Sequence, residues 1–273
     1  MRISFILIAA TTLSVANWRA LATGGGPDQL TPPPALASPT TTKTYAVRLA
    51  PNVAITLDGR ADEAAWAQAN VERGFIFPWK TIPAPPTEFR AVCDERYLYF
   101  HFRVHDGDVV VLDQLRDEED AVLEDRVELY FAADAELHDY YCVEIDSRGR
   151  VFDYRGRYYR QLDPKWNLQG IEAQGAPTPE GYEVEARIPL SRLEAMGLPS
   201  LLAGERIRCG LYRAEFSHDR SGKQVVVKET IHNRGRKTEG PPPIEAWISW
   251  VDPGTAEPDF HIPSSLGFLE LAK

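Results

Sequence analysis

Hydrophobic and polar residues alternate over many short stretches of this chain. The stretch 97–104 reads YLYFHFRV, and every second residue from Leu98 to Val104 is apolar. The same period recurs in RVELYF at 126–131, after the acidic loop DEEDAVLED at 117–125. Successive side chains of an extended strand point to opposite faces, so a period of two predicts half-buried strands.

Similar stretches follow along the chain between turns rich in Gly, Pro, Asn and Asp. We expect strands at 45–49, 88–93, 97–104, 126–132, 140–146, 151–154, 171–174, 182–188, 206–212, 247–249 and 268–271. Short helices are expected at 61–68, where alanines favour a helix, and at 191–196, before Gly197. The pattern predicts an all-β fold: a single antiparallel β-sandwich of the immunoglobulin or jelly-roll kind, with one or two short helices.

Residues 1–44 differ in composition from the rest of the chain. Residues 1–22 combine Arg2, the apolar run ISFILIAATTLSVA and an Ala-Leu-Ala ending, which is typical of a secretory signal peptide. Residues 23–44 are rich in Gly, Pro and Thr and predict a flexible linker before a domain at 45–273. The apolar run is short for a membrane span, so we expect export to the periplasm or the medium without membrane insertion.

Charge and cysteine content restrict the partners and the disulfides that the chain could have. The chain has 30 basic and 40 acidic side chains, a formal net charge of −10, which disfavours nucleic acid as a partner. Cys93, Cys142 and Cys209 form an odd set, so at most one disulfide can close within the chain. We favour three small buried hydrophobic side chains, and we expect a monomer without a nucleotide cofactor.

Carboxylates gather on one face of two predicted strands. In 140–146, Glu144 and Asp146 share a face, and if 126–132 is the neighbouring strand, Glu128 lies close to them. Such a surface could accept hydrogen bonds from sugar hydroxyls or bind a cation. A solvated outer face explains the same pattern equally well, and the sequence leaves both interpretations open.

A glycoside hydrolase is the enzymatic alternative. It would use two of Glu128, Glu144 and Asp146, with carboxyl groups about 5 to 9.5 Å apart and one raised pKa. No single pair stands out in these acid-rich surroundings, so catalysis ranks below binding and no catalytic residue is assigned. His101 and His105 lie on one predicted strand about 13 Å apart, which is too far for one zinc ion.

Acidic side chains also suggest a structural calcium ion. Asp58, Asp62 and Glu63 stand close together near the start of the domain, and the loop 117–125 adds further oxygen ligands. The spacing of an EF-hand does not occur. A solvated turn is the favoured explanation for any one of these acids, so Ca²⁺ at Asp58, Asp62 and Glu63 is a hypothesis.

Tryptophans are the natural platforms for pyranose rings, although most tryptophans fill cores. Trp66 and Trp247 lie within a predicted helix and strand, and we assign both to packing. Trp79, in the loop sequence FPWK, and Trp166, in DPKWN, are the preferred platform candidates.

Several motifs together resemble the family 9 carbohydrate-binding modules of the DOMON-like β-sandwich group. In chain order they are Leu57-Asp58-Gly59 with Asp62, Glu63 and Trp66; Asp94 with Tyr97-Leu98-Tyr99 and Asp106; Asp125 with Val127-Glu128; Gly181-Tyr182 with Val184-Glu185 and Ile188-Pro189; and Pro258, Phe260 and Gly267. The likeness covers most of residues 53–271. It implies a non-catalytic, calcium-stabilised sandwich that binds polysaccharide ends or small sugars and supports carbohydrate catabolism by glycoside hydrolases.

The resemblance also implies particular ligand contacts. Members of the family clamp a sugar between two tryptophans, and the matching positions here are Phe260 and Val122, of which Val122 cannot stack. Glu128 matches an acid that hydrogen-bonds the sugar. Haem, which some DOMON relatives bind through methionine, is not expected, because Met196 is the one methionine after the leader.

The expected glycan contacts follow from these observations. They are Phe260, Trp79, Trp166, Glu128, Glu144 and Asp146. The missing aromatic ring at Val122 supports a further alternative, a surface interaction protein that has lost sugar binding.

Overall fold

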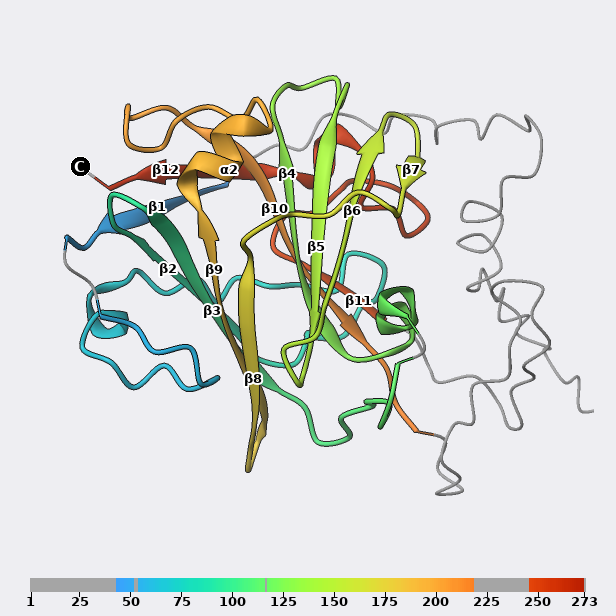
Figure 1. Cartoon of the computed structure of the whole chain (residues 1–273). Helices are drawn as coiled ribbons and strands as arrows, with labels where there is room; N and C mark the ends of the chain where they lie inside the picture. Colours follow the sequence, from blue (N-terminus) through green and yellow to red (C-terminus); the bar gives the residue numbers. More distant parts are fainter. Residues whose placement is uncertain (1–42, 52–53, 116, 219–245, 273) are drawn as a thin grey trace, which may run out of the picture.

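A continuous, curled β-sheet dominates the protein. The computed structural model describes residues 43–51, 54–115, 117–218 and 246–272, which exclude the predicted leader and nearly all of the linker. The strands are β1 (Thr44–Leu49), β2 (Thr87–Cys93), β3 (Tyr97–His105), β4 (Arg126–Ala132), β5 (Tyr140–Asp146), β6 (Val151–Arg157), β7 (Gln161–Asp163), β8 (Glu172–Thr178), β9 (Gly181–Pro189), β10 (Ile207–Glu215), β11 (Ala246–Ser249) and β12 (Gly267–Leu271). Their order is β7-β6-β5-β4-β10-β12-β1-β2-β3-β9-β8, and β11 pairs with β10 (Figure 1).

Strand β1 joins the two halves of the sheet. Residues 44–47 pair in parallel with β12, and Arg48 and Leu49 pair in parallel with β2. The all-β character is confirmed, but the predicted sandwich of purely antiparallel sheets is wrong. One mixed sheet curls into a half-barrel, because a single strand hydrogen-bonds to both halves.

The two ends of the curled sheet approach each other at a pair of glycines. The turn between β5 and β6 lies against the edge strand β8, where a Cβ atom on Gly175 would stand 2.4 Å from the carbonyl oxygen of Ser147. Gly149 in that turn has a φ of +83°, and a Cβ there would stand 2.6 Å from Cα of Gln174. Backbone therefore packs directly on backbone at this point.

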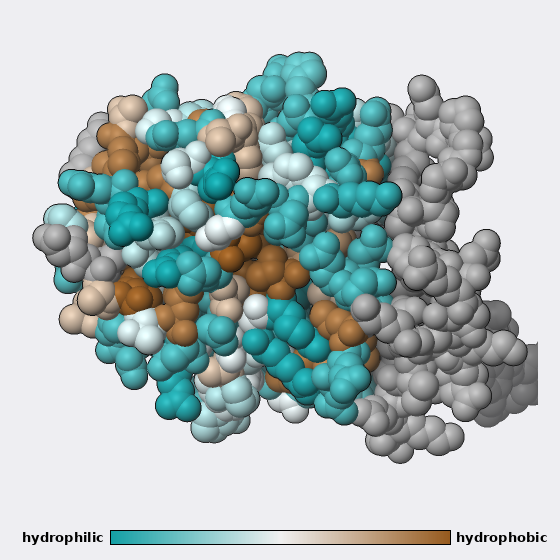
Figure 2. Space-filling view, in the orientation of Figure 1, coloured by the Kyte–Doolittle hydropathy of each residue, from teal (hydrophilic) through white to brown (hydrophobic). Residues whose placement is uncertain are grey.

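The face drawn in Figure 2 is largely hydrophilic, and hydrophobic side chains show near its middle, between the positions of β8 and β5 in Figure 1.

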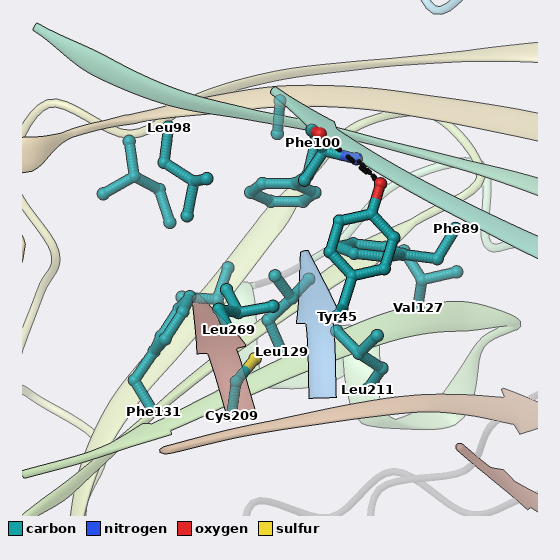
Figure 3. Close-up of a cluster of buried hydrophobic side chains, with 14 of the residues drawn as sticks. Tyr45, Phe89, Leu98, Phe100, Val127, Leu129, Phe131, Cys209, Leu211 and Leu269 are labelled. Carbon is teal, nitrogen blue, oxygen red and sulfur yellow. Dashed lines mark hydrogen bonds between the residues drawn. The ribbon is translucent and has the colours of Figure 1, made fainter. Parts of the chain in front are cut away.

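The main hydrophobic core fills the inside of the curl. Tyr45 illustrates how it is built, because its ring meets Phe89 edge to face at 5.0 Å (Figure 3). The Tyr45 hydroxyl accepts a 2.7 Å hydrogen bond from the Ala91 amide and donates one of 2.6 Å to the carbonyl of Asn70. A polar atom at this depth needs such partners.

The three cysteines are free and buried, as expected for small hydrophobic side chains. Cys93 and Cys209 belong to the main core, whereas Cys142 lies on the opposite face of the sheet. Burial, with a smaller effect of Asp94, raises the pKa of the Cys93 thiol to about 11. These thiols are therefore protonated at neutral pH.

The helices are shorter than the sequence suggests. They are the 3-10 turns η1 (Trp66–Gln68), η2 (Glu118–Leu123) and η3 (Pro263–Ser265) and the α-helix α2 (Leu190–Ala195). The helix expected at 61–68 shrinks to η1 because the segment before it follows another partner. The amides of Asp58, Gly59 and Arg60 all donate to Glu185 Oε2, and Trp66 Nε1 donates to Glu185 Oε1 at 2.8 Å.

The eleven expected strands are all present within a few residues, and β7 was not anticipated. None of the helices in the described ranges is long and apolar enough to cross a membrane.

Candidate functional site

A second hydrophobic cluster covers the face of β4, β5, β6 and β10 that points away from the main core. Strand pairing sets Tyr212, Glu128, Glu144 and Phe152 in one row across this face. We call the surrounding side chains the aromatic cluster. It comprises the buried residues Tyr130, Tyr140, Phe152, Tyr154, Tyr212 and Phe260 and the partly buried residues Trp79, Val122 and Trp247 at its margin.

Phe260 stands at the centre of three aromatic contacts. Its ring stacks on Tyr212 at 4.1 Å between centroids and 15° between planes. Trp79 packs against it at 5.4 Å, and Trp247 meets it edge to face at 6.0 Å. Trp79 is fixed further by a 2.9 Å hydrogen bond from Nε1 to the carbonyl of Thr255. Phe260 is 5% exposed, so it supports two tryptophans that lie nearer the surface.

Glu128 and Glu144 lie directly opposite each other. The strand phase predicted only that Glu128 would lie close to Glu144 or Asp146 if the two strands were neighbours. Both side chains are buried and form ion pairs with Arg126, at 2.9 Å from Nη2 to Glu128 and 2.6 Å from Nε to Glu144. The Tyr154 hydroxyl donates to Glu144 at 2.9 Å. The alternative of a solvated outer face is therefore wrong, because loops and aromatic rings cover these acids.

Arg126 was not among the site residues predicted from the sequence. It stands two residues before Glu128 on the same strand, so the period that placed Glu128 on this face also places Arg126 there.

One guanidinium serves two buried carboxylates in this network. Burial, together with the charge of the neighbouring Glu144, raises the pKa of Glu128 to about 8, although Arg126 opposes both effects. Burial alone would lower the pKa of Arg126, but Glu144 and Glu128 hold it above its ordinary value. The guanidinium thus stays charged at neutral pH.

Arg126 also reaches the margin of the aromatic cluster. Its guanidinium lies 5.5 Å from the ring centroid of Trp247, a cation–π contact, and Nη1 donates a 2.9 Å hydrogen bond to the carbonyl of Val122. Trp247, which the sequence analysis assigned to packing alone, is thereby held close to the position that lacks an aromatic ring.

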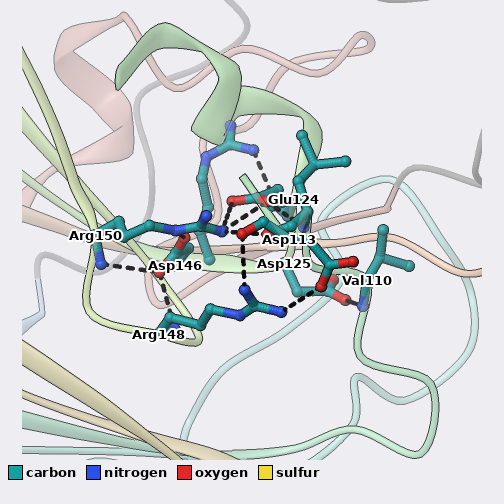
Figure 4. Close-up of polar contacts among 9 residues, drawn as sticks. Val110, Asp113, Glu124, Asp125, Asp146, Arg148 and Arg150 are labelled. Atoms are coloured by element: carbon teal, nitrogen blue, oxygen red, sulfur yellow. Dashed lines mark hydrogen bonds and ion pairs between the residues drawn. The ribbon is translucent and has the colours of Figure 1, made fainter. Parts of the chain in front are cut away.

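The side chain of Asp146 forms hydrogen bonds and an ion pair within the turn between β5 and β6 (Figure 4). Its Oδ1 accepts the amides of Arg148 and Arg150 at 2.8 and 2.9 Å, and its Oδ2 pairs with Nε of Arg150. Arg150 Nη2 reaches Glu124 at 2.9 Å, so this guanidinium also bridges two buried acids. Burial raises the pKa of Glu124 to about 8, and its hydrogen bond with Asp146 adds to that effect.

The structure brings some of the predicted site residues together and separates others. Phe260 and Trp79 touch, and Glu128 and Glu144 lie in the row beside Tyr212. Trp166 instead packs on the main core, 4.9 Å from the ring of Tyr141.

The acids near the domain start serve the local backbone. Asp58 Oδ1 accepts the amide of Arg60 at 2.9 Å, and Glu63 Oε1 accepts that of Thr56 at 2.8 Å. In the described part of the chain, two other groups bring three possible ligand atoms within 4.8 Å of one another. They are the largely exposed Asp134, Glu136 and His138, and the largely buried Asp106, Asp125 and Glu215.

Solved structures of other proteins resemble this architecture. A protein from Bacteroides uniformis described as carbohydrate-binding has 18% identity and a TM-score of 0.60, with 85% of this chain and 100% of that chain covered. A family 9 module from Caldicellulosiruptor kristjanssonii, solved with glucose, has 19% identity, a TM-score of 0.48 and coverage of 84% and 96%. The same kind of module solved with cellotriose has 18% identity, a TM-score of 0.48 and coverage of 84% and 93%.

No curated protein matches the sequence. At these identities the Bacteroides structure shows a shared fold. The model of the carbohydrate family 9 binding domain-like family matches residues 57–273, which is nearly the whole folded part, and the chain therefore belongs to that family.

Proposed function

We propose that the protein binds carbohydrate at the margin of the aromatic cluster, with Trp79 and Trp247 as the stacking surfaces. The observation that carries this proposal is the position of Phe260, which stacks on Tyr212 and supports both tryptophans. Flat aromatic rings held rigidly in this way lose little entropy when an apolar sugar face packs on them. Family membership supports the same function.

The buried acids have a positioning role in this proposal. Glu128 and Glu144 hold Arg126, and Arg126 holds both the Trp247 ring and the backbone at Val122. Trp247 thus compensates for the aliphatic side chain at Val122. In this proposal a sugar contacts the tryptophans and nearby polar groups. The buried carboxylates of Glu128 and Glu144 do not touch the sugar and only position Arg126.

A hydrolytic role receives less support from the same geometry. The carboxyl groups that would perform it are bound to Arg126 and to the Tyr154 hydroxyl, and both are buried. A glycosidase needs its acid and its nucleophile or base open to substrate. We therefore propose a binding protein that is exported by its leader and assists glycan breakdown by separate enzymes.

The test measures retention on insoluble cellulose and affinity for glucose and cellotriose. These probes are chosen because family 9 modules have been solved with both sugars. Trp79→Ala and Trp247→Ala should each weaken binding by about tenfold or more, which corresponds to loss of one stacking contact. Trp166→Ala is the matched control, since Trp166 is also partly buried but packs on the main core.

Equal affinity in all three variants and the unmodified protein would contradict the proposed surface. Steady release of reducing sugar from cellotriose would favour the hydrolase instead.

A further inference from the structure

The loop that carries Phe260 is attached to two other parts of the sheet. It spans residues 250–262, between β11 and η3, and passes beside β7 (Figure 1). Asp259 and His261 flank Phe260, and both residues are buried. The Nδ1 atom of His261 forms a 2.9 Å hydrogen bond with the hydroxyl of Tyr140 on β5. Asp259 is bound by the turn between β6 and β7, so Phe260 stands between two anchored neighbours.

The carboxylate of Asp259 accepts hydrogen bonds from both sides. Its Oδ1 accepts a bond from Nη2 of Arg160 at 2.6 Å and one from the amide of His261 at 2.9 Å. Its Oδ2 accepts a bond from the hydroxyl of Tyr159 at 2.6 Å, and Nε of Arg160 donates to that hydroxyl at 3.2 Å. The Asp259 and Arg160 side chains are only 5% and 12% exposed. Loss of either partner would leave a charge with little access to solvent, which is costly.

The same loop holds the indole of Trp79. The ring of Phe260 packs on this indole at 5.4 Å between centroids, and the Thr255 carbonyl accepts a 2.9 Å hydrogen bond from its Nε1. Phe260 also meets the ring of Trp247 edge to face at 6.0 Å. A shift of this loop would therefore move both of these supports of Trp79 and change its position relative to Trp247.

We propose that Arg160 and Asp259 are positioning residues of the sugar surface. Their ion pair fixes the loop at residues 250–262, and the loop fixes Trp79 in the position that stacks on a sugar. Neither residue of the pair touches the sugar. The inference rests on the proposed function, because it concerns the same tryptophans. Arg160 lies 99 residues before Asp259 in the chain, so only the fold gives it this role.

Asp259→Asn is the first variant that tests the inference. Asparagine keeps an Oδ1 acceptor for the His261 amide and removes the charge that binds Arg160. If the loop then holds the binding-competent position about one fifth of the time, the affinity for cellotriose falls about fivefold. Arg160→Met should have the same effect, and the double variant should bind no more weakly than either single variant, because the two residues act through one contact. Calorimetry measures all three affinities.

Glu183→Gln is the matched control. Glu183 is also buried, and its carboxylate binds Arg103 at 2.8 Å and His101 at 2.8 Å on the other half of the sheet. This variant also removes one partner of a buried ion pair, so it should lower the thermal midpoint as Asp259→Asn does. Its affinity for cellotriose should equal that of the unmodified protein.

A spectroscopic measurement tests the inference without any sugar. The indole N–H signal of Trp79, in a proton–nitrogen correlation spectrum of isotope-labelled protein, is identified by its loss in Trp79→Ala. In Asp259→Asn this signal should shift or broaden, because the indole donates its hydrogen bond to the loop. In Glu183→Gln the signal should stay unchanged.

Undiminished affinity in folded Asp259→Asn overturns the inference wherever Trp79→Ala weakens binding, and so does an unmoved indole signal. An equal loss of affinity in Glu183→Gln overturns it as well, since the effect would then reflect general stability. If Asp259→Asn does not fold, Tyr159→Phe serves as the second variant, because it removes one hydroxyl donor and leaves the ion pair. Its effects should have the same direction, and their absence would contradict the proposal.

The proposed function can fail separately from this inference. If Trp79→Ala and Trp247→Ala bind sugar like the unmodified protein, the proposed sugar surface is wrong. The indole signal then decides whether Arg160 and Asp259 position Trp79.

Discussion

Glu128 and Glu144 face each other across β4 and β5 and share the guanidinium of Arg126, at 2.9 and 2.6 Å. All three side chains are buried, so their charges interact with little screening by solvent. This relationship connects the stability of the sheet with the position of Trp247, because the same guanidinium lies over the indole ring.

Removal of Arg126 should be severely destabilising. Arg126→Met leaves two carboxylates buried together, and we expect a loss of about 3 to 5 kcal/mol in the free energy of unfolding. The control is Arg73→Met, whose side chain is 61% exposed and pairs with Glu88, and which should cost no more than about 1 kcal/mol. Urea unfolding followed by circular dichroism measures both, and equal losses would contradict the central role of Arg126.

Stability should fall as the pH rises from about 7 through 8. Burial, with the Glu144 charge, raises the pKa of Glu128 from 4.5 to about 8. Between these values the folded protein holds a proton that the unfolded chain has released, so this contribution is complete below pH 4.5 and is lost as the pH rises through 8.

Other groups define the range in which this effect can be measured. Burial lowers the pKa of His101 and His261, which opposes the trend only below about pH 6.5. Burial also raises the pKa of Glu124 to about 8, which adds to the trend. Glu128→Gln should flatten the profile above pH 7, whereas Glu172→Gln on the exposed edge strand should not. Parallel profiles for both variants would count against a raised pKa at Glu128.

The contact between the two ends of the sheet should depend on the absence of a side chain at Gly175. Gly175→Ala would bring a methyl group to 2.4 Å from the Ser147 carbonyl oxygen, and we expect a loss of about 1 to 3 kcal/mol. Gly107→Ala is the matched control, because a Cβ there would meet nothing within 4 Å. Thermal unfolding measures both variants, and a midpoint for Gly175→Ala as high as that of Gly107→Ala would show that this contact is dispensable.

Local periodicity predicted much of the fold. It located the strands at 126–132 and 140–146 to the residue, and it predicted that Glu128 would lie close to Glu144 or Asp146 if these strands were neighbours. It could not predict the parallel pairing of β1 with both β12 and β2, because partner and direction depend on residues far apart in the chain. The missing helical turn at 61–65 has the same origin, since Glu185, more than a hundred residues away, binds the backbone amides of the preceding residues 58–60.

The site was predictable only in part. The aromatic residue at Phe260 and the loop tryptophan Trp79 carried recognisable signals, and Arg126 could have been found from strand phase. Asp106 and Asp125 belonged to motifs that the sequence analysis quoted, but their proximity to Glu215 could not be predicted, because the three residues lie far apart in the chain. The alternation of its strand is compatible with packing for Trp247, and only the fold shows that it lies partly buried at the margin of the aromatic cluster.

The place of β12 between β10 and β1 has a consequence for the rate of folding. Strand β1 begins at Thr44, and its partner β12 begins at Gly267, so their pairing closes a very long loop of chain. Loop-closure entropy opposes such a contact before it contributes any stability, and sheets built on distant pairings fold slowly. The native state should therefore be acquired late, after the local hairpins have formed.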